Sequence, residues 1–272
     1  MSELVIIPPG EKLSHLPTDS AFAHGFGLFE TMRLADGKLF FWEDHWGRLS
    51  NSATCFGFKL PGKDQVVAAL RELVEGADFR EAALKLSLVR EGSGSRLYVY
   101  SRPLMAVTDK YTLRLDPSCP IFERSTLAGH KTHSYMENIY LLQRARSMGY
   151  DDLIRVDSRG NLAETTTANF FFLQGDRLHT PALETGILPG VTREVLLRSC
   201  GLPLEVGLYS PERLLQADAV FVSNATTGIR VADRIEGFAG GETRSFDVNL
   251  PILEAIKARY RHSVEADAVT LC

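Results

Sequence analysis

Apolar and polar residues follow two different periods in the N-terminal part of the chain. An apolar residue at every third or fourth position predicts helices at 43–57 and 63–76. Shorter apolar runs without that spacing predict strands at 3–9, 27–42, 83–107 and 111–116. Turn residues interrupt two of these runs, at Asp36-Gly37 and at the Gly-Ser segment 92–95, so each run predicts a hairpin.

The C-terminal part mixes the two periods without a regular strand–helix–strand repeat. A helix is predicted at 136–148, with its apolar side formed by Ile139, Leu142, Ala145 and Met148. Residues 151–181 predict a meander of strands with turns at 158–160 and 174–176. The remaining elements are helices at 190–201, 211–218 and 251–267, and a strand at 219–224.

Residues 116–130 show neither period, which indicates a connection between two domains. We therefore predict an α+β protein of two domains. The smaller N-terminal α/β domain is expected at 1–115 and the larger C-terminal domain at 131–272.

Charge and composition exclude several classes of partner. The net charge of -4 argues against nucleic acid or an anionic membrane as the main partner, because both require a basic surface. No stretch has the length and apolar character of a membrane span, and the N-terminus does not resemble a signal peptide. The four cysteines form no CxxC pair, so we expect no metal site, no disulfide framework and a cytoplasmic location. Small-molecule chemistry is the favoured class.

Three places in the chain carry groups suited to an anion, and each also has an ordinary structural explanation. Gly190, Val191 and Thr192 begin a predicted helix, where unpaired N–H groups attract negative charge, although Thr192 is also a common N-cap. Ser223 and Asn224 open the cluster "SNATTG", which is equally typical of a loop. Arg48 is either a surface helix arginine or a phosphate ligand.

Lys131 and Glu164 are the two candidates for chemistry. Lys131 lies in "GHKTHSYMENIY", and most lysines are solvated surface residues. Glu164 lies in "NLAETTTANFFF", where a carboxylate is either exposed or buried beside a cation. The residue types alone do not choose between these alternatives.

The order and spacing of these motifs resemble the class IV, fold type IV pyridoxal-phosphate enzymes. The most specific pieces are the Asp-x-x-Gly-x-x-x-Glu-x-x-x-x-Asn signature, which starts at Asp157, and the segment "LPGVTR". The opening "HGFGLFETMR…DGKLFFWEDHWGRL" matches the same family. The resemblance runs from about residue 20 to residue 236 and implies a two-domain fold like that of D-amino-acid aminotransferase.

The resemblance implies pyridoxal 5'-phosphate as cofactor and a role for each candidate. Lys131 stands where the family has the lysine that binds the cofactor as a Schiff base, and its freed amine then moves a proton. Glu164 matches the carboxylate that faces the pyridine nitrogen. The phosphate would bind to the following residues: Arg48, Val191, Thr192, Ser223 and Asn224.

Three activities of the family compete, and local features favour 4-amino-4-deoxychorismate lyase, which gives 4-aminobenzoate and pyruvate for folate synthesis. Arg96 and Tyr98 resemble the Arg-Gly-Tyr of the lyases and are expected to bind substrate, although Arg96 is equally explained as a strand-edge charge. Phe29, a further expected substrate contact, replaces a tyrosine that the D-amino-acid enzymes share. The alternative within the family is a transaminase of D-amino acids or branched-chain L-amino acids with 2-oxoglutarate.

Outside the family's chemistry, the chain could be a non-catalytic protein that binds a phosphate-bearing ligand. The presence of both Lys131 and Glu164 speaks against that alternative. The resemblance also implies a homodimer with a shared active site, in which the Arg96 loop reaches the neighbouring subunit.

Overall fold

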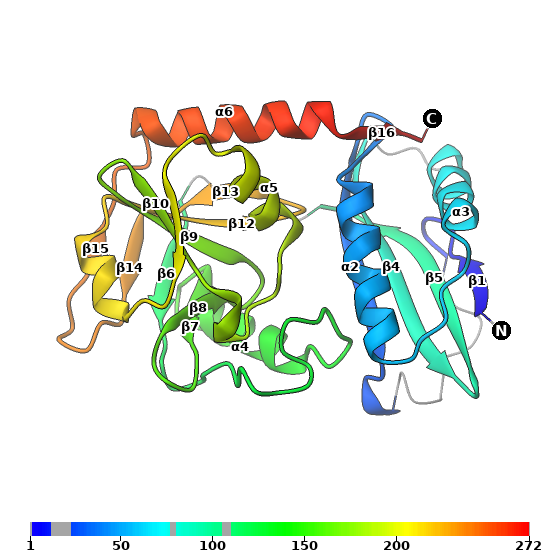
Figure 1. Ribbon diagram of the computed structural model, residues 1–272, viewed down its shortest axis with the longest axis horizontal. Helices are drawn as coiled ribbons and strands as arrows, with labels where there is room; N and C mark the ends of the chain where they lie inside the picture. Colours follow the sequence, from blue (N-terminus) through cyan, green and yellow to red (C-terminus); the bar gives the residue numbers. More distant parts are fainter. Residues whose placement is uncertain (1, 12–22, 77–79, 105–109, 272) are drawn as a thin grey trace. The chain divides into compact units, whose positions relative to one another are not determined.

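The computed structural model describes residues 2–11, 23–76, 80–104 and 110–271. The chain forms two compact units, and each is described by itself (Figure 1). The first unit contains Met1–Ala106, His130–Tyr135 and Val264–Cys272, and the second contains Val107–Gly129 and Met136–Ser263.

These units differ from the ranges expected from the sequence. The strand at 112–115 pairs within the second unit, whereas the expected N-terminal domain included it. Residues 130–135 and the C-terminal end join the first unit, because both pair with its strands. Backbone pairing between residues far apart in the sequence therefore decides the division of the chain.

The first unit is built on one six-stranded sheet in the order β1-β5-β4-β2-β3-β16. The strands are β1 (Ser2–Ile6), β2 (Gly27–Ala35), β3 (Lys38–Phe40), β4 (Glu81–Glu91), β5 (Gly94–Arg102) and β16 (Ala268–Thr270). The predicted hairpin at Asp36-Gly37 is confirmed, since both residues have positive φ and connect β2 with β3. The predicted hairpin at 92–95 is confirmed as well, by the pairing of β4 with β5.

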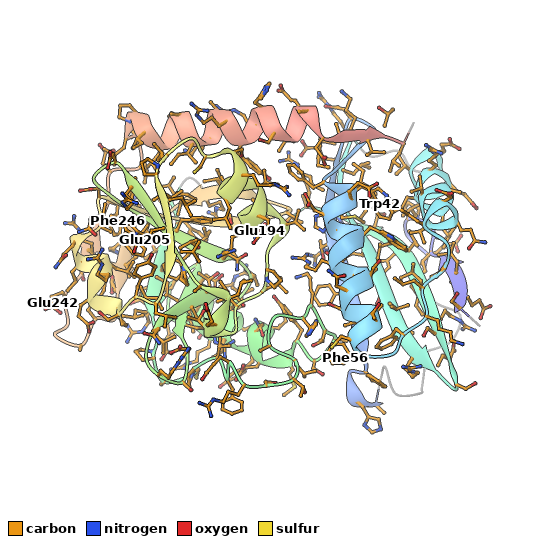
Figure 2. The ribbon with its side chains drawn as sticks, viewed as in Figure 1. Trp42, Phe56, Glu194, Glu205, Glu242 and Phe246 are labelled. Atoms are coloured by element: carbon orange, nitrogen blue, oxygen red, sulfur yellow. The ribbon has the colours of Figure 1, made fainter. Side chains whose placement is uncertain are left out.

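Two helices cover one face of this sheet, α2 (Trp42–Cys55) and α3 (Lys63–Glu75), as the sequence predicted (Figure 1). Figure 2 marks the two ends of α2 with Trp42 and Phe56. The core between helices and sheet is apolar, with Leu49 and Leu70 from the helices against Leu28 and Leu86 from the strands. Burial of these side chains is the main driving force for the unit. These two helices leave the other face of the sheet uncovered.

The second unit contains two five-stranded sheets. One has the order β15-β14-β6-β7-β8 and the other the order β11-β10-β9-β12-β13. The first of them consists of β6 (Thr112–Leu115), β7 (Asp152–Val156), β8 (Leu162–Thr165), β14 (Arg234–Glu236) and β15 (Arg244–Ser245). The second consists of β9 (Asn169–Gln174), β10 (Arg177–Pro181), β11 (Leu204–Gly207), β12 (Ala219–Asn224) and β13 (Gly228–Val231).

The predicted meander at 151–181 is wrong in one respect, because its strands divide between the two sheets. β9 is buried on both faces, which explains its continuous apolar sequence. Phe170 and Phe172 pack into the core that the two sheets share, whereas Phe171 packs against Leu196 and Leu253 from the helices.

The helices of the second unit are α4 (Met136–Ser147), α5 (Val191–Ser199) and α6 (Pro251–Ala266), with 3-10 turns η1 (Leu183–Thr185) and η2 (Pro211–Gln216). Their predicted positions are confirmed, although 211–218 forms a 3-10 turn. The predicted apolar side of α4 is confirmed at Ala145, which is buried, and is wrong at Ile139 and Met148, which are about 40% exposed. Leu141 is the other buried residue of the helix. Among the described residues, no helix combines the length and apolar character that crossing a membrane requires.

Asp152 is a buried carboxylate that orders the turn between β8 and β9. Its Oδ1 accepts hydrogen bonds from the backbone N–H groups of Leu153 at 2.8 Å and Thr166 at 3.1 Å, and from the Thr166 hydroxyl at 2.5 Å. The Thr167 hydroxyl donates to Oδ2 at 3.2 Å. Burial raises the pKa of Asp152, although these hydrogen bonds oppose the rise.

We expect Asp152→Ala to lower the free energy of unfolding by about 2–4 kcal/mol, because buried N–H and hydroxyl donors lose their acceptor. Urea unfolding followed by circular dichroism measures the change. Asp176→Ala, in the exposed turn between β9 and β10, is the control and should change stability by less than about 0.5 kcal/mol. Equal effects of the two substitutions would contradict the role assigned to Asp152.

Candidate active site

Lys131 lies at the edge of the sheet in the first unit. On this side of β2, β3 covers only the end of the strand, at Leu34 and Ala35. The first half of β2 pairs with the segment 131–133 instead. Leu28 and Thr132 form an antiparallel bridge, and the N–H of Phe29 donates to the carbonyl of Lys131 at 2.9 Å. Side chains alternate along paired strands, so Lys131 shares the face of Phe29.

The residue before Lys131 confirms this alternation. His130 lies on the helix-covered face, where its Nδ1 and the Ser52 Oγ of α2 are 2.9 Å apart. Phe56, labelled at the end of α2 in Figure 2, contacts the His130 ring edge-on at 4.8 Å. Lys131 therefore projects from the face that α2 and α3 leave uncovered.

Two aromatic rings surround the amine of Lys131. Its Nζ lies 4.4 Å from the ring centroid of Phe29 and 5.4 Å from that of Tyr135. These two rings pack edge-on at 5.3 Å. A cation over aromatic faces is attracted by their quadrupoles, and the rings restrict the rotamers of the lysine. Phe29, expected as a substrate contact, thus lies directly beside the candidate nucleophile.

A second lysine, Lys85 on β4, lies beside the same ring and was missed by the sequence analysis. Its Nζ is 4.0 Å from the Phe29 centroid and donates to the Thr31 Oγ1 at 2.9 Å. Burial, together with the positive charges of Lys131 and Arg102, lowers the pKa of Lys85 to about 7, although Glu30 opposes the change. Lys85 forms no ion pair with a carboxylate in the described part of the chain. A half-buried amine that forms no ion pair with a described carboxylate favours an anionic ligand, whose negative charge would stabilise its protonated form.

Arg48 lies on the other, helix-covered face of the first unit's sheet. Its Nε and Nη2 donate to the two oxygens of Glu30 at 2.8 and 2.7 Å. The Nδ1 of His45 is 2.8 Å from the same carboxylate. Burial alone would raise the pKa of Glu30, but the charge of Arg48 and the hydrogen bonds from Arg48 and His45 hold it well below its usual range. The expected role of Arg48 in cofactor binding stays a prediction.

Arg96 and Tyr98 lie on β5 in the register opposite Val89 and Ser87 of β4. The Nε of Arg96 is 3.0 Å from a Glu3 oxygen and 2.8 Å from a Glu91 oxygen, and its Nη1 approaches the Tyr98 hydroxyl at 3.5 Å. Glu3 and Glu91 thus balance the positive charge of Arg96, as a substrate carboxylate would do if it bound there. The expected role of both residues in substrate binding stays a prediction.

In the second unit, Glu164 on β8 is tied to the loop before α5. Its Oε2 accepts hydrogen bonds from the Asn169 Nδ2 at 2.9 Å and from the Leu188 N–H at 3.2 Å. The same Nδ2 donates to the Leu188 carbonyl at 2.9 Å. Asn169 was recognised only as part of a sequence signature, and the structure shows that it links the carboxylate to the loop.

Gly190 is required by the close approach of Asn169. A Cβ at position 190 would lie 1.9 Å from the Asn169 Oδ1, well inside van der Waals contact. Gly190 is also the N-cap of α5, and it has no side chain that could cap the first N–H groups. The start of α5 therefore leaves N–H groups for an anion, beginning at Val191.

Two predicted phosphate ligands have buried hydroxyls without a hydrogen-bond partner. The Thr192 Oγ1 on α5 and the Ser223 Oγ on β12 are both in this state within the described residues, and both residues are at most 2% exposed. The two elements pack against each other. Buried polar groups are normally satisfied, so these two hydroxyls, one at the N-terminus of α5 and one on β12, are suited to a bound acceptor such as a phosphate.

Asn224 has a different task from the one expected. Its Oδ1 accepts from the backbone N–H and the hydroxyl of both Thr226 and Thr227, at 2.9 to 3.1 Å. The side chain thus orders the turn from 224 to 227, which follows Ser223. Its direct contact with a phosphate stays a prediction.

The profile of the family described as Amino-transferase class IV matches residues 27–235. This match covers most of the 272 residues. The chain belongs to the class IV aminotransferases. It is accordingly a pyridoxal-phosphate-dependent enzyme with the fold type IV architecture, as the sequence predicted.

Individual relatives of this class IV enzyme carry several activities. Aminodeoxychorismate lyase of Bacillus subtilis (strain 168) is 28% identical over 253 residues, which cover 84% of this chain and 85% of the relative. D-alanine aminotransferase of Bacillus licheniformis is 26% identical over 234 residues, covering 80% and 82%. A solved structure from Legionella pneumophila, "Putative 4-amino-4-deoxychorismate lyase", has a TM-score of 0.84 and 26% identity, covering 96% and 99%.

The groups found in the class IV enzyme fit its cofactor. A phosphate would satisfy the buried hydroxyls of Thr192 and Ser223 and the first N–H groups of α5. Glu164 is a carboxylate held in place by two donors, as a partner for a pyridine nitrogen should be. Lys131 presents an amine on the uncovered face of its sheet.

We expect Gly190→Ala in this class IV enzyme to weaken pyridoxal-phosphate binding by about tenfold or more, because the new methyl group displaces Asn169 and with it Glu164. Titration of the cofactor-free protein with pyridoxal phosphate measures the dissociation constant. Gly47→Ala is the control, since a Cβ at that position within α2 meets open space. Unchanged affinity in the Gly190 variant would contradict the packing argument.

We expect Lys85→Met to flatten the pH dependence of stability between about pH 7 and pH 10. The unfolded chain binds a proton at Lys85 in this window that the folded enzyme lacks, because the folded pKa is about 7. The free energy of unfolding of the unmodified enzyme therefore rises with pH there. Urea unfolding of both proteins at about pH 7 and about pH 9 measures the slopes. Identical slopes would contradict the lowered pKa.

Proposed function

We propose that this class IV enzyme is an aminodeoxychorismate lyase, which converts 4-amino-4-deoxychorismate into 4-aminobenzoate and pyruvate. The observation that carries the proposal is Lys85, a half-buried amine without an ion pair to a described carboxylate, beside Lys131 and Phe29. The substrate is a dicarboxylate with one amino group. Lys131 suits the amino group, and Lys85 suits one of the carboxylates.

Sequence similarity supports the same choice among the family's activities. The Bacillus subtilis lyase is 28% identical over 84% of this chain. Phe29 gives the site an apolar wall beside both amines, which suits a cyclohexadiene ring. Thr31, whose hydroxyl accepts from Lys85, adds a polar group on the same face.

Pyridoxal phosphate, when bound, withdraws electrons from the carbon that carries the substrate's amino group. The residues that would hold it are Lys131 at the aldehyde, Glu164 at the ring nitrogen, and Val191, Thr192 and Ser223 at the phosphate, with Arg48 and Asn224 as the further predicted ligands. Each of these positions has the charge or hydrogen-bonding group that its role requires.

The chemical step belongs to Lys131. Its Nζ takes the proton from the carbon that bears the amino group, the bond from the ring to the enolpyruvyl oxygen breaks, and the ring becomes aromatic. The departing enolate takes a proton and leaves as pyruvate. The rings of Phe29 and Tyr135 contact this amine and restrict its position. Lys85 orients the substrate by attracting a carboxylate.

We further propose that the enzyme acts in the cytoplasm, in folate synthesis, as a homodimer. Support for the dimer comes from exposed apolar side chains on the second unit. Phe122 and Tyr140 are about 60% exposed and Met136 is 85% exposed. Large exposed apolar side chains are frequent at subunit interfaces. The expected reach of the Arg96 loop into the neighbouring subunit belongs to the same proposal.

The purified enzyme, incubated with aminodeoxychorismate, should release 4-aminobenzoate and pyruvate and form no glutamate. Lys131→Ala should abolish the reaction. Lys85→Met should raise KM about tenfold, since a charged hydrogen bond contributes about 1.5 kcal/mol or more. Lys63→Met, at an exposed lysine of α3, is the control and should leave KM unchanged.

A second pair of assays tests the alternative activity. D-alanine or L-leucine is supplied with 2-oxoglutarate, and glutamate is measured. Glutamate formation without any release of 4-aminobenzoate would contradict the proposed lyase and identify a transaminase.

A further inference from the structure

Arg193, in the second unit, is a buried arginine to which the proposed chemistry gives no task. It is the residue after Thr192 on α5 and is only 2% exposed, so its guanidinium lies in the interior of the unit. An arginine keeps its positive charge in such an environment, and the charge must be balanced by nearby groups. The question is which carboxylate balances it.

Two of the groups that contact the guanidinium balance its charge poorly. Its Nη2 donates to the Pro181 carbonyl at 3.0 Å, which provides a dipole but no charge. Its Nη1 donates to Glu194 at 2.7 Å, but that carboxylate is 40% exposed and therefore well hydrated (Figure 2 labels Glu194 on α5). The Nε is buried and has no partner among the described residues. A second carboxylate would therefore add to the stabilisation that Glu194 gives the buried charge.

Glu164 is the other carboxylate that attracts Arg193. Burial lowers the pKa of Arg193, and the negative charges of Glu194 and Glu164 oppose the change. The geometry explains the attraction to Glu164. Pro181, which accepts from Arg193, ends β10, and β10 contacts β8, the strand that carries Glu164.

The short loop before α5 also connects Glu164 with Arg193. Glu164 holds the N–H of Leu188, and α5 starts two residues later at the Gly190 cap. A Cβ at position 190 would meet both the Asn169 amide and the Arg193 side chain, so the three residues pack around one point. Glu164 and Arg193 are therefore anchored at the two ends of the same tightly packed loop.

We propose that Arg193 is a positioning residue that keeps Glu164 ionised and in place for the ring nitrogen of pyridoxal phosphate. The inference rests on the proposed role of Glu164. Because its Nη1 and Nη2 already donate to Glu194 and to the Pro181 carbonyl, Arg193 acts through the carboxylate of Glu164. Its positive charge favours the carboxylate over the neutral acid, and a carboxylate is the form that pairs with a protonated pyridine.

The test compares two cofactors that differ only at the ring nitrogen. Full-length protein is freed of cofactor and titrated with pyridoxal phosphate and with 1-deazapyridoxal phosphate, in which a carbon replaces the ring nitrogen. The ratio of the two dissociation constants reports the interaction at that nitrogen and cancels general losses in affinity. Binding is followed by quenching of tryptophan fluorescence, so no substrate is needed.

The unmodified protein should prefer pyridoxal phosphate, and Glu164→Gln should remove most of that preference. Arg193→Gln should reduce the preference about tenfold, the change that one unit of pKa produces. Arg193→Lys, which keeps the charge, should retain most of it. Arg198→Gln, an exposed arginine on the same helix, is the matched control and should have no effect.

The variants also separate the possible failures. Loss of preference in Glu164→Gln but not in Arg193→Gln overturns the role of Arg193 and leaves that of Glu164 intact. An unchanged preference in Glu164→Gln overturns both. If Arg193→Gln does not fold, Arg193→Lys decides: a preference reduced as far as in Glu164→Gln contradicts an electrostatic role, and a retained preference supports it. None of these outcomes depends on the identity of the substrate.

Discussion

The pairing of residues 131–133 with the first half of β2 is the constraint on which the candidate chemistry of the first unit depends. β3 leaves that half of the strand edge unpaired, and backbone groups at a strand edge need partners. Because Thr132 pairs with Leu28 and side chains alternate along a strand, Lys131 must lie on the opposite face from Thr132, the face of Phe29. A register shifted by one residue would move Lys131 to the helix-covered side and His130 to the other.

The two faces of this sheet separate two kinds of charge. On the helix-covered face, Arg48 donates a bidentate hydrogen bond to the buried carboxylate of Glu30. On the other face, Lys85 and Lys131 both lie beside Phe29, and Lys85 has no ion pair to a described carboxylate. An ion pair stabilises the unit by itself, whereas a pair of amines beside an aromatic ring is costly unless an anion binds. The amines beside Phe29 are therefore the groups of this unit that suit a substrate carboxylate.

In the second unit, the loop from Leu188 to Gly190 both contacts Glu164 and starts α5. Glu164 and Asn169 hold the loop at Leu188, and Gly190 permits the close approach. The same loop starts α5, whose N-terminus and Thr192 hydroxyl are suited to a phosphate. One backbone segment therefore couples the carboxylate to the anion site, which limits the substitutions that either can tolerate.

The sequence by itself determined the elements whose signals are local. Helical spacing predicted α2, α3 and α5, and Asp36-Gly37 predicted a hairpin, because these patterns involve residues only a few positions apart. The motif order also led to Lys131 and Glu164, and to the family that the profile match established. Only the tertiary structure placed Lys131 beside Phe29, revealed Lys85 and Arg193, and paired Arg48 with Glu30. These contacts join residues distant in the chain, and no local period encodes which strand edges meet or which charges share a face.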